Sequence, residues 1–316
     1  MQLRDKIIYI LESNKGDYVS GQAIATSCGV SRSAVAKCIN ALKSEGYEIS
    51  SVNNLGHRLD PKCDILSESG IRAALGDDGT EIKVFKTIDS TSTEAKRALN
   101  EGLSAEAVFA SESQTAGRGR RGKSFYSPSG SGLYFSCVLY PNASLSDSAA
   151  LTSAAAVAVC KAIEHTTDTK PQIKWVNDIF IDGKKVCGIL TEAVSDFESQ
   201  SVQAVIIGIG INLTTDIFPE ELGGIAASLG CKPDRCRLIA EIFKNIKELC
   251  EKLPDKNFMN DYRARSLVLG KRITFTRNGI FYTATAESID DNGELSVIAE
   301  NGEKMLLNSG EISVKL

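Results

Sequence analysis

The chain has little of the chemistry that builds metal centres or membrane spans. It has 316 residues but only two histidines, His57 and His165, and its nine cysteines include no Cys-x-x-Cys pair. Structural zinc sites draw on closely spaced Cys and His ligands, so we expect no tightly bound metal. No apolar run reaches the roughly 20 residues of a membrane span, so no membrane segment is expected.

The chain also lacks a charge of one dominant sign. Its formal net charge is −4, so any contact with nucleic acid must come from a local patch. The first residues lead into an amphipathic helix pattern and not into the core of a signal peptide. Cysteines such as Cys38, Cys137 and Cys187 occupy apolar positions, which is typical of free buried thiols in a reducing compartment. We therefore expect a cytoplasmic protein.

The most unusual segment that is present is 117–124, Gly-Arg-Gly-Arg-Arg-Gly-Lys-Ser. Its glycines let a ligand approach the backbone closely, and its cations favour an anion such as phosphate. The segment matches the P-loop pattern, but a P-loop must open into a helix, and Pro128 with two glycines follows here. A solvated basic loop is the alternative. Crowded arginines repel one another unless an anion is present, which favours an anion-binding loop.

Residues 1–61 show three helix signals followed by a hairpin signal. Ser31 is a good N-cap for the third helix, which has Val35, Ile39 and Leu42 on one face. The turn Asn53-Asn54 then predicts a β-hairpin. This order is typical of a winged helix-turn-helix domain.

The third helix carries the candidate DNA contacts, which are Ser31, Arg32, Ser33 and Lys37. These polar and basic side chains are expected on its exposed side, where they can meet base edges and phosphates. The alternative is a winged helix used only for protein contacts, since residues 1–60 hold seven Lys/Arg against six Asp/Glu. The sequence pattern around the turn is typical of DNA readers and favours DNA binding.

The rest of the chain divides into a mixed α/β region and a region of short strands. Three Asn-Gly turns, at Asn278, Asn292 and Asn301, predict a small antiparallel β-barrel at the end. The predicted fold class is therefore α+β with three domains, at 1–61, 62–266 and 267–316. Central strands are expected at 82–88, 105–111, 132–140, 171–175, 185–193 and 202–211, and helices at 90–99, about 146–165 and 235–252.

Polar groups gather at four places in the central domain. Ser90 and Thr91 start a helix whose N–H groups can receive a carbonyl or a phosphate, although a plain capping segment is the alternative. In 174–178, Lys-Trp-Val-Asn-Asp is either a binding group or an Asn/Asp-stabilised turn. Lys185 opens an apolar strand and can neutralise a carboxylate or an α-phosphate, or simply end the strand. Two glycines in the strand 205–212 indicate close approach of a ligand or another backbone.

Taken in order, these segments resemble biotin protein ligases of the bifunctional type that also binds DNA as the biotin operon repressor. The shared motifs are Gly-Arg-Gly-Arg-x-Gly before Ser-Pro, Lys-Trp-x-Asn-Asp, Lys-x-x-Gly-Ile-Leu and Gly-x-Gly-Ile-Asn, and 310–313 also fits. The resemblance covers essentially the whole chain. It implies an N-terminal winged helix, a central biotin/lipoate-type ligase domain and a C-terminal SH3-like β-barrel.

The resemblance also implies a reaction. Biotin and ATP, with Mg²⁺, would form biotinyl-5′-AMP and pyrophosphate, and a lysine of a biotin carboxyl carrier domain would then attack the mixed anhydride. The implied catalytic residues are Arg120, Lys185 and Asp178. The implied biotin contacts are Ser90, Thr91, Gln114, Gly117, Arg118, Arg120, Tyr134, Lys185, Gly188 and Gly208. The implied ATP or adenylate contacts are Arg120, Arg121, Lys123, Phe125, Asn177, Asp178, Lys185 and Asn212.

Some positions depart from the family pattern. Val176 replaces a frequent proline, which should loosen the turn before Asn177. Lys123 and Phe125 stand where arginine and tryptophan are common; Phe125 can still stack on adenine, but Lys123 cannot form a bidentate fork. Lys315 stands where some relatives carry an arginine near the nucleotide.

The family also implies a homodimer that biotinyl-AMP promotes and that binds a two-fold operator. Two rival functions follow from the same residues. A lipoate protein ligase shares the fold and the adenylation logic, but it does not normally carry a winged helix or this arginine loop. A transcription regulator that only senses a small molecule is the second rival. Such a regulator needs no groups placed for adenylation, so the presence of Arg120, Lys185 and the pair Asn177-Asp178 argues against it.

Overall fold

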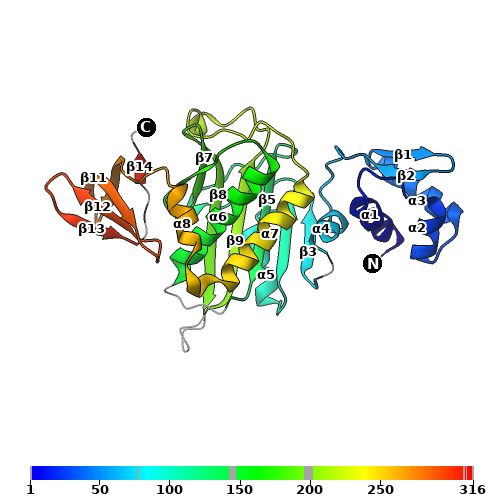
Figure 1. The fold of residues 1–316 in the computed structure, drawn as a ribbon, viewed down its shortest axis with the longest axis horizontal. Coiled ribbons are helices and arrows are strands. Elements are labelled where there is room, and N and C mark those ends of the chain that lie inside the picture. The colour runs from blue at the N-terminus through cyan, green and yellow to red at the C-terminus, as the bar shows by residue number, and fades with distance from the viewer. Residues whose placement is uncertain are drawn as a thin grey trace. The chain divides into compact units, whose positions relative to one another are not determined.

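The computed structural model describes residues 2–76, 78–141, 147–195, 202–308, 310 and 312–314 (Figure 1). Its internal contacts divide the chain into two compact units. The first unit combines Met1–Val84 with Lys232–Glu241, and the second combines Phe85–Cys231 with Ile242–Leu316. The domain boundaries expected after residues 61 and 266 stay predictions.

The first unit contains the expected winged helix-turn-helix. Ser20 and Ser31 cap the second and third helices, because their side chains accept from the N–H groups of Ala23 and Ala34. The core between these elements is apolar and includes Ile7, which is fully buried. The elements are α1 Leu3–Ser13, α2 Gly21–Cys28, α3 Arg32–Ser44, β1 Ile49–Val52 and β2 Gly56–Leu59.

Close backbone contact fixes the wing formed by β1 and β2. His57 exchanges backbone hydrogen bonds with Val19 at 2.8 and 2.9 Å. Gly56 has a φ of +111°, and a Cβ there would lie 2.1 Å from the Val19 carbonyl oxygen. Only glycine fits this position, because any side chain would force the wing away from Val19.

A distant segment of the chain completes the first unit. Lys15, with only 3% of its side chain exposed, pairs with Glu12 at 3.2 Å and with Asp234 at 2.5 Å. Arg235 donates from Nε to Asp64 at 2.8 Å. The pairs Lys15–Asp234 and Arg235–Asp64 join residues more than 170 positions apart and attach the segment Lys232–Glu241 to the N-terminal part of the first unit. Arg235 begins α7 Arg235–Glu251, and a further helix of the first unit, α4 Glu68–Leu75, packs against α1.

The largest sheet of the described chain has seven strands in the order β3-β4-β5-β9-β8-β7-β6, and its ladders from β4 to β6 are antiparallel. All eight residues of β5 are buried, which explains why its sequence is apolar without alternation. The six expected strands are present with bounds that differ by a few residues. They are β3 Glu81–Phe85, β4 Ala107–Ser111, β5 Gly132–Leu139, β6 Gln172–Lys174, β8 Lys184–Ser195 and β9 Val202–Asn212. A seventh strand, β7 Asp178–Ile181, was not expected.

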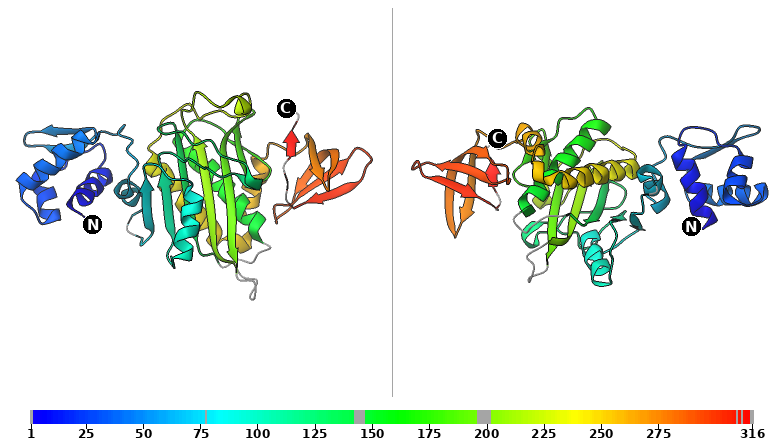
Figure 2. Two further views of the ribbon diagram at one scale, coloured as in Figure 1. Left: turned by 180° about the vertical axis from the view of Figure 1, so that it is seen from behind. Right: turned by 60° about the horizontal axis from the view of Figure 1, so that its bottom comes forward.

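Helices pack on both faces of this sheet. Figure 1 shows α6 Ser148–Thr166 and α8 Phe258–Ala264 in front of the strands, and the view from behind in Figure 2 shows α5 Thr91–Asn100 on the opposite face. The small residues of α6, such as Ala154 and Ala158, are fully buried, so the helix can approach the sheet closely. Helix α5 packs against β4, β5 and β9. Its first turn therefore lies beside the middle of the sheet.

The last region is a five-stranded antiparallel sheet in the order β13-β12-β11-β10-β14. Asn278 and Gly279 have φ values of 51° and 79° and link β10 to β11 by the predicted two-residue turn. No ladder joins β13 to β14 in the described part of the chain. The strands are β10 Arg272–Arg277, β11 Ile280–Ile289, β12 Leu295–Ala299, β13 Lys304–Leu307 and β14 Ile312–Val314.

Candidate active site

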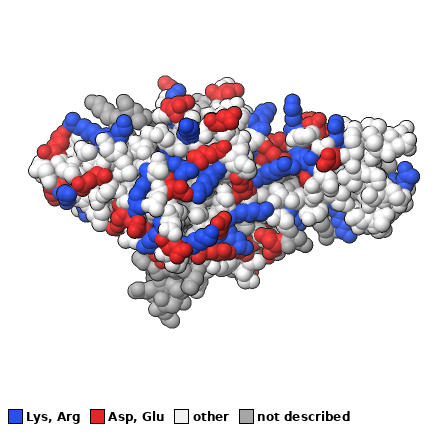
Figure 3. Space-filling view, viewed as in Figure 1, with Lys and Arg blue, Asp and Glu red and all other residues white. Residues whose placement is uncertain are grey.

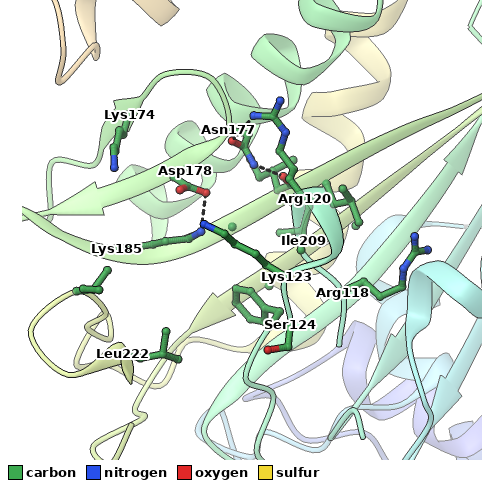
Figure 4. A pocket seen from close by; sticks show the side chains of 18 of the residues that line it. Arg118, Arg120, Lys123, Ser124, Lys174, Asn177, Asp178, Lys185, Ile209 and Leu222 are labelled. Carbon is green, nitrogen blue, oxygen red and sulfur yellow. Dashed lines mark hydrogen bonds and ion pairs between the residues drawn. The ribbon is translucent and has the colours of Figure 1, made fainter. Parts of the chain in front are cut away.

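A cavity of about 500 Å³ opens within the second unit (Figure 4). Its walls come from the start of α5, the arginine loop, the β7–β8 hairpin, strand β9, the segment after β9 and the chain near β14. The lining residues are Ser90, Thr91, Ser92, Gln114, Arg118, Gly119, Arg120, Lys123, Ser124, Phe125, Lys174, Trp175, Asn177, Asp178, Phe180, Lys185, Gly188, Ile189, Leu190, Gly208, Ile209, Gly210, Glu221, Leu222, Ile225, Gly310, Ile312 and Ser313.

The β7–β8 hairpin places a carboxylate and an ammonium side by side. Asp178 begins β7, Lys185 lies near the start of β8, and the turn between these strands uses positive φ values at Asp182 and Gly183. Lys185 Nζ lies 2.6 Å from Asp178 Oδ1, as the dashed line in Figure 4 shows. About a quarter of each side chain is exposed, so an entering ligand can reach both groups.

Two hydrogen bonds hold the Arg120 side chain at the cavity wall. Its Nη1 donates to Asn177 Oδ1 at 3.2 Å and to the Gly310 carbonyl oxygen at 3.3 Å. Asn177 in turn donates from Nδ2 to the Ile189 carbonyl oxygen at 2.6 Å. Because these bonds fix the guanidinium in place, it needs little reorganisation to meet developing negative charge.

The start of α5 is tied to the sheet by hydroxyl groups. The Thr91 backbone N–H donates to Gln114 Oε1 at 2.9 Å, and Gln114 Nε2 donates to Ser127 Oγ at 2.9 Å. The hydroxyls of Thr91 and Ser92 lie 2.8 and 3.0 Å from Ser136 Oγ on β5. These hydrogen bonds within the protein hold the start of α5 in place, and Ser90, Thr91 and Ser92 line the cavity.

Glycines in β8 and β9 make room for an aromatic ring. A Cβ at Gly210 would lie 2.4 Å from the Phe125 ring, and one at Gly188 would lie 3.1 Å from it. A Cβ at Gly208 would lie 2.4 Å from Ser92 Oγ. The predicted close approach at these strand glycines is therefore real, and in this structure the approaching groups are side chains of the protein itself.

The structure gathers most of the predicted site residues around one cavity. Four of the predicted residues do not line it: Gly117, Arg121, Tyr134 and Asn212. A Cβ at Gly117 would lie 2.4 Å from the Phe125 carbonyl oxygen, and Arg121 is exposed with a φ of 55°. Tyr134 donates from its hydroxyl to Pro128, and Asn212 donates from Nδ2 to Ala227. Ligand contact by these four stays a prediction.

Three lining residues had no signal in the sequence: Glu221, Leu222 and Ile225, which come from the segment after β9. They reach the cavity through the tertiary fold and belong to no local motif. Gly310 and Ser313 near β14 belong to the segment 310–313 that fits the family pattern, but no site role was assigned to them from the sequence. Lys174 and Trp175 stood in the motif noted above and also line the cavity. Glu311 and Lys315 lie outside the described residues.

The P-loop interpretation is excluded by the backbone. After the single 3₁₀ turn at Arg120–Gly122, no helix begins between Lys123 and Gly132. The chain instead folds back, because Phe125 donates its N–H to the Gly117 carbonyl oxygen at 2.8 Å. The segment 117–125 is therefore a small hairpin-like loop at the cavity edge.

The cysteine nearest in sequence to a cavity glycine is Cys187. Burial raises the pKa of the Cys187 thiol well above its ordinary value, so this thiol beside Gly188 stays neutral. Among the described residues, no group of three or more His, Cys, Asp or Glu side chains is placed to hold a metal ion. In the same part of the chain, no helix is long and apolar enough to cross a membrane.

The candidate DNA contacts lie together on α3. Ser31, Arg32, Ser33 and Lys37 are all exposed, while Val35 between them is fully buried. Ser31 Oγ also lies 2.8 Å from Ser33 Oγ. On the face shown in Figure 3, basic and acidic side chains are interspersed over the described residues, so a DNA contact depends on local cations such as these.

Comparison with known families gives three matches along the chain. Residues 4–58 match a helix-turn-helix domain, residues 84–212 match the biotin/lipoate A/B protein ligase family, and residues 268–315 match the biotin protein ligase C-terminal domain. The order is the one expected from the sequence.

Individual proteins agree with these matches. The bifunctional ligase/repressor BirA of Bacillus spizizenii is 36% identical over 324 residues, covering 97% of each chain. The protein of the same name from Escherichia coli is 27% identical and covers 98% of this chain and 96% of its own length. The structure of biotin protein ligase from Aquifex aeolicus in complex with biotin and ATP superposes with a TM-score of 0.63 at 29% identity, covering 74% of this chain and 98% of that one. The chain belongs to the family of bifunctional biotin protein ligase/repressors.

Proposed function

We propose that this protein activates biotin with ATP and transfers it to a lysine of a biotin carboxyl carrier domain, and that it represses transcription of biotin genes. The observation that carries the ligase half is the cavity in which Arg120, Lys185 and Asp178 meet within one site. In the first step a biotin carboxylate oxygen attacks the α-phosphorus of ATP and pyrophosphate leaves. In the second step the carrier lysine attacks the carbonyl carbon of the mixed anhydride and AMP leaves.

The positions of the cations suit the first step. Two negative groups, a carboxylate and the α-phosphate, must approach each other, and fixed positive groups offset that repulsion in a site shielded from water. Lys185 and Arg120 supply such groups from different walls of the cavity. We assign the end near Ser90, Thr91 and Gly208 to biotin, since hydroxyl and N–H groups there can meet the polar atoms of its ring.

We place ATP towards Arg120, Lys123, Phe125 and Asn177. The exposed Lys123 can reach phosphate oxygens. The Phe125 ring can stack on adenine after the ring moves away from Gly210, which it now contacts. Mg²⁺ would enter with ATP, held by phosphate oxygens and by no more than one or two carboxylates of the protein. Asp178 and Glu221 are the lining carboxylates among the described residues.

The repressor half rests on the winged helix. Arg32 and Lys37 on the exposed side of α3 suit contact with base edges and phosphates, and Ser31 and Ser33 suit further hydrogen bonds. We propose that biotinyl-AMP promotes a homodimer, whose two α3 helices then bind a two-fold operator.

Biotin transfer to a purified carrier domain tests the ligase. ATP-dependent labelling of one carrier lysine is expected, and Arg120→Ala and Lys185→Ala should each lower it about 10²- to 10³-fold. Arg272→Ala is the control, because Arg272 is an exposed arginine on β10 that pairs with Glu300. Biotin binding without labelling would leave a sensor that has no ligase activity. Labelling with lipoate in place of biotin would make the protein a lipoate ligase.

A further inference from the structure

A carboxylate on β8 holds the first arginine of the loop. Arg118 donates from Nη2 to Glu192 Oε1 at 3.1 Å and from Nη1 to Oε2 at 3.2 Å, which is a bidentate pair. Lys96 on α5 donates to the same Oε1 at 2.8 Å. The loop, the sheet and the helix thus meet at a single carboxylate.

This group lies at the edge of the cavity. Alternate residues of a strand face the same side, so Glu192 shares a face of β8 with Gly188 and Leu190, which both line the cavity. Arg118 also lines it, although in Figure 4 its side chain points away from Asp178 and Lys185. Exposure of 22% for Glu192 and 39% for Arg118 leaves the pair partly shielded from water.

Arg118 attaches the loop to the sheet. The loop closes on itself through the bonds from Phe125 N–H to Gly117 and from Gly119 N–H to Lys123, at 2.8 and 2.7 Å. Arg120 attaches it to Asn177, and Arg118 attaches it to Glu192. A small internally bonded loop moves as one piece, so loss of the Arg118–Glu192 attachment should loosen the whole loop.

We infer that Glu192, supported by Lys96, is a positioning residue that keeps the loop 117–125 closed over the bound adenylate until the carrier lysine arrives. This inference rests on the proposed ligase function. An open loop admits water, whose oxygen attacks the carbonyl carbon of biotinyl-AMP. The bond from that carbon to the phosphate oxygen breaks, and biotin and AMP are released, so one ATP is consumed without labelling.

The tether itself can be tested without any ligand. Trypsin cleaves after arginine, and the loop holds three, so limited trypsin digestion of the ligand-free protein reports how often the loop opens. Glu192→Gln should speed cleavage within 117–123 about two- to fivefold, as expected for losing a partly exposed ion pair. Glu106→Gln is the matched control, because Glu106 forms a pair with Lys247 of similar exposure, outside the cavity lining. Unchanged cleavage in Glu192→Gln would overturn the tether.

The consequence is tested by the ratio of AMP released to carrier labelled. Glu192→Gln should raise this ratio about two- to fivefold relative to wild type and to Glu106→Gln. If Glu192 acts through Arg118, the double variant with Arg118→Gln should match Arg118→Gln alone. A faster-cleaved loop with an unchanged ratio would refute the retention role. Wild-type protein that forms no AMP would refute the proposed function instead, and trypsin digestion would still decide the tether.

Discussion

Asp178 and Lys185 form an ion pair of 2.6 Å at the β7–β8 hairpin. This contact is compatible with two roles of the Asp178 carboxylate in the reaction. The carboxylate can orient Lys185, or it can accept the proton of the incoming carrier lysine. We expect Asp178→Asn to lower the transfer step about 10²- to 10⁴-fold, as for loss of a general base, while adenylation falls much less because Lys185 and Arg120 are unchanged. Single-turnover assays that follow pyrophosphate and carrier labelling separately measure both steps. Equal losses in both would assign Asp178 to orienting Lys185.

Among single residues, the sequence predicted those site residues whose chemistry is unusual for their local pattern. Lys185 opens an apolar strand, and Asp178 follows the single Trp of the chain by three positions. Both line the cavity. Glu192 and Gly310 could not be found in this way. The role of Glu192 appears only when Arg118 arrives from a loop 74 positions away, and Gly310 contributes a backbone oxygen that any residue type carries.

The caps of the second and third helices offer a matched pair of substitutions. Ser20 and Ser31 each accept one backbone N–H, at 3.0 and 3.2 Å, so Ser20→Ala and Ser31→Ala should each cost about 1 kcal/mol of unfolding free energy. Only Ser31 belongs to the proposed DNA contacts. Urea unfolding should therefore show similar losses, whereas a gel shift with operator DNA should weaken mainly for Ser31→Ala. Equal DNA binding by the two variants would remove Ser31 from the DNA contacts.

The wing predicts a pH dependence. Burial, and then the charge of Lys43, lowers the pKa of His57, whose Nδ1 lies 2.9 Å from Ser51 Oγ. As pH falls through the ordinary histidine range, the unfolded chain binds a proton that the folded wing resists, so stability is lost on acidification. Urea unfolding followed by a signal from the first unit, at pH 7.5 and at pH 5.5, measures this loss of unfolding free energy. His57→Gln should reduce the difference in unfolding free energy between the two pH values. An unchanged difference would exclude His57 as its source.

Elements were predictable where local rules decide them. The Asn-Gly turn at 278–279 and the Ser31 cap on α3 are confirmed, since backbone geometry alone selects these residues. The Ser20 cap on α2 was not predicted. Helix α4 was not predicted, because Gly70 breaks its pattern. A Cβ at Gly70 would lie 2.8 Å from Cys236 Sγ, so the glycine serves close packing against α7, which no local pattern reveals.

At the scale of the whole chain, the family and the α+β fold class with its winged helix, ligase domain and C-terminal sheet are confirmed. The make-up of the first unit was not foreseen. It takes in Lys232–Glu241, which Lys15 binds through Asp234. Such a long-range ion pair leaves no trace in composition or periodicity, because each partner alone is an ordinary surface residue type.

The net charge of −4 makes operator binding by a single chain weak, so the repressor should depend on bringing two winged helices to one site. We expect biotinyl-AMP to shift sedimentation from monomer to dimer and to lower the protein concentration needed for an operator gel shift, whereas biotin alone should do neither. Lys37→Ala should reduce the slope of log affinity against log salt by about 2, one phosphate contact for each subunit. Lys62→Ala, an exposed lysine off α3, is the control. If the adenylate left sedimentation unchanged while operator binding still rose, the ligand would act within one chain, and dimerisation would not be the switch.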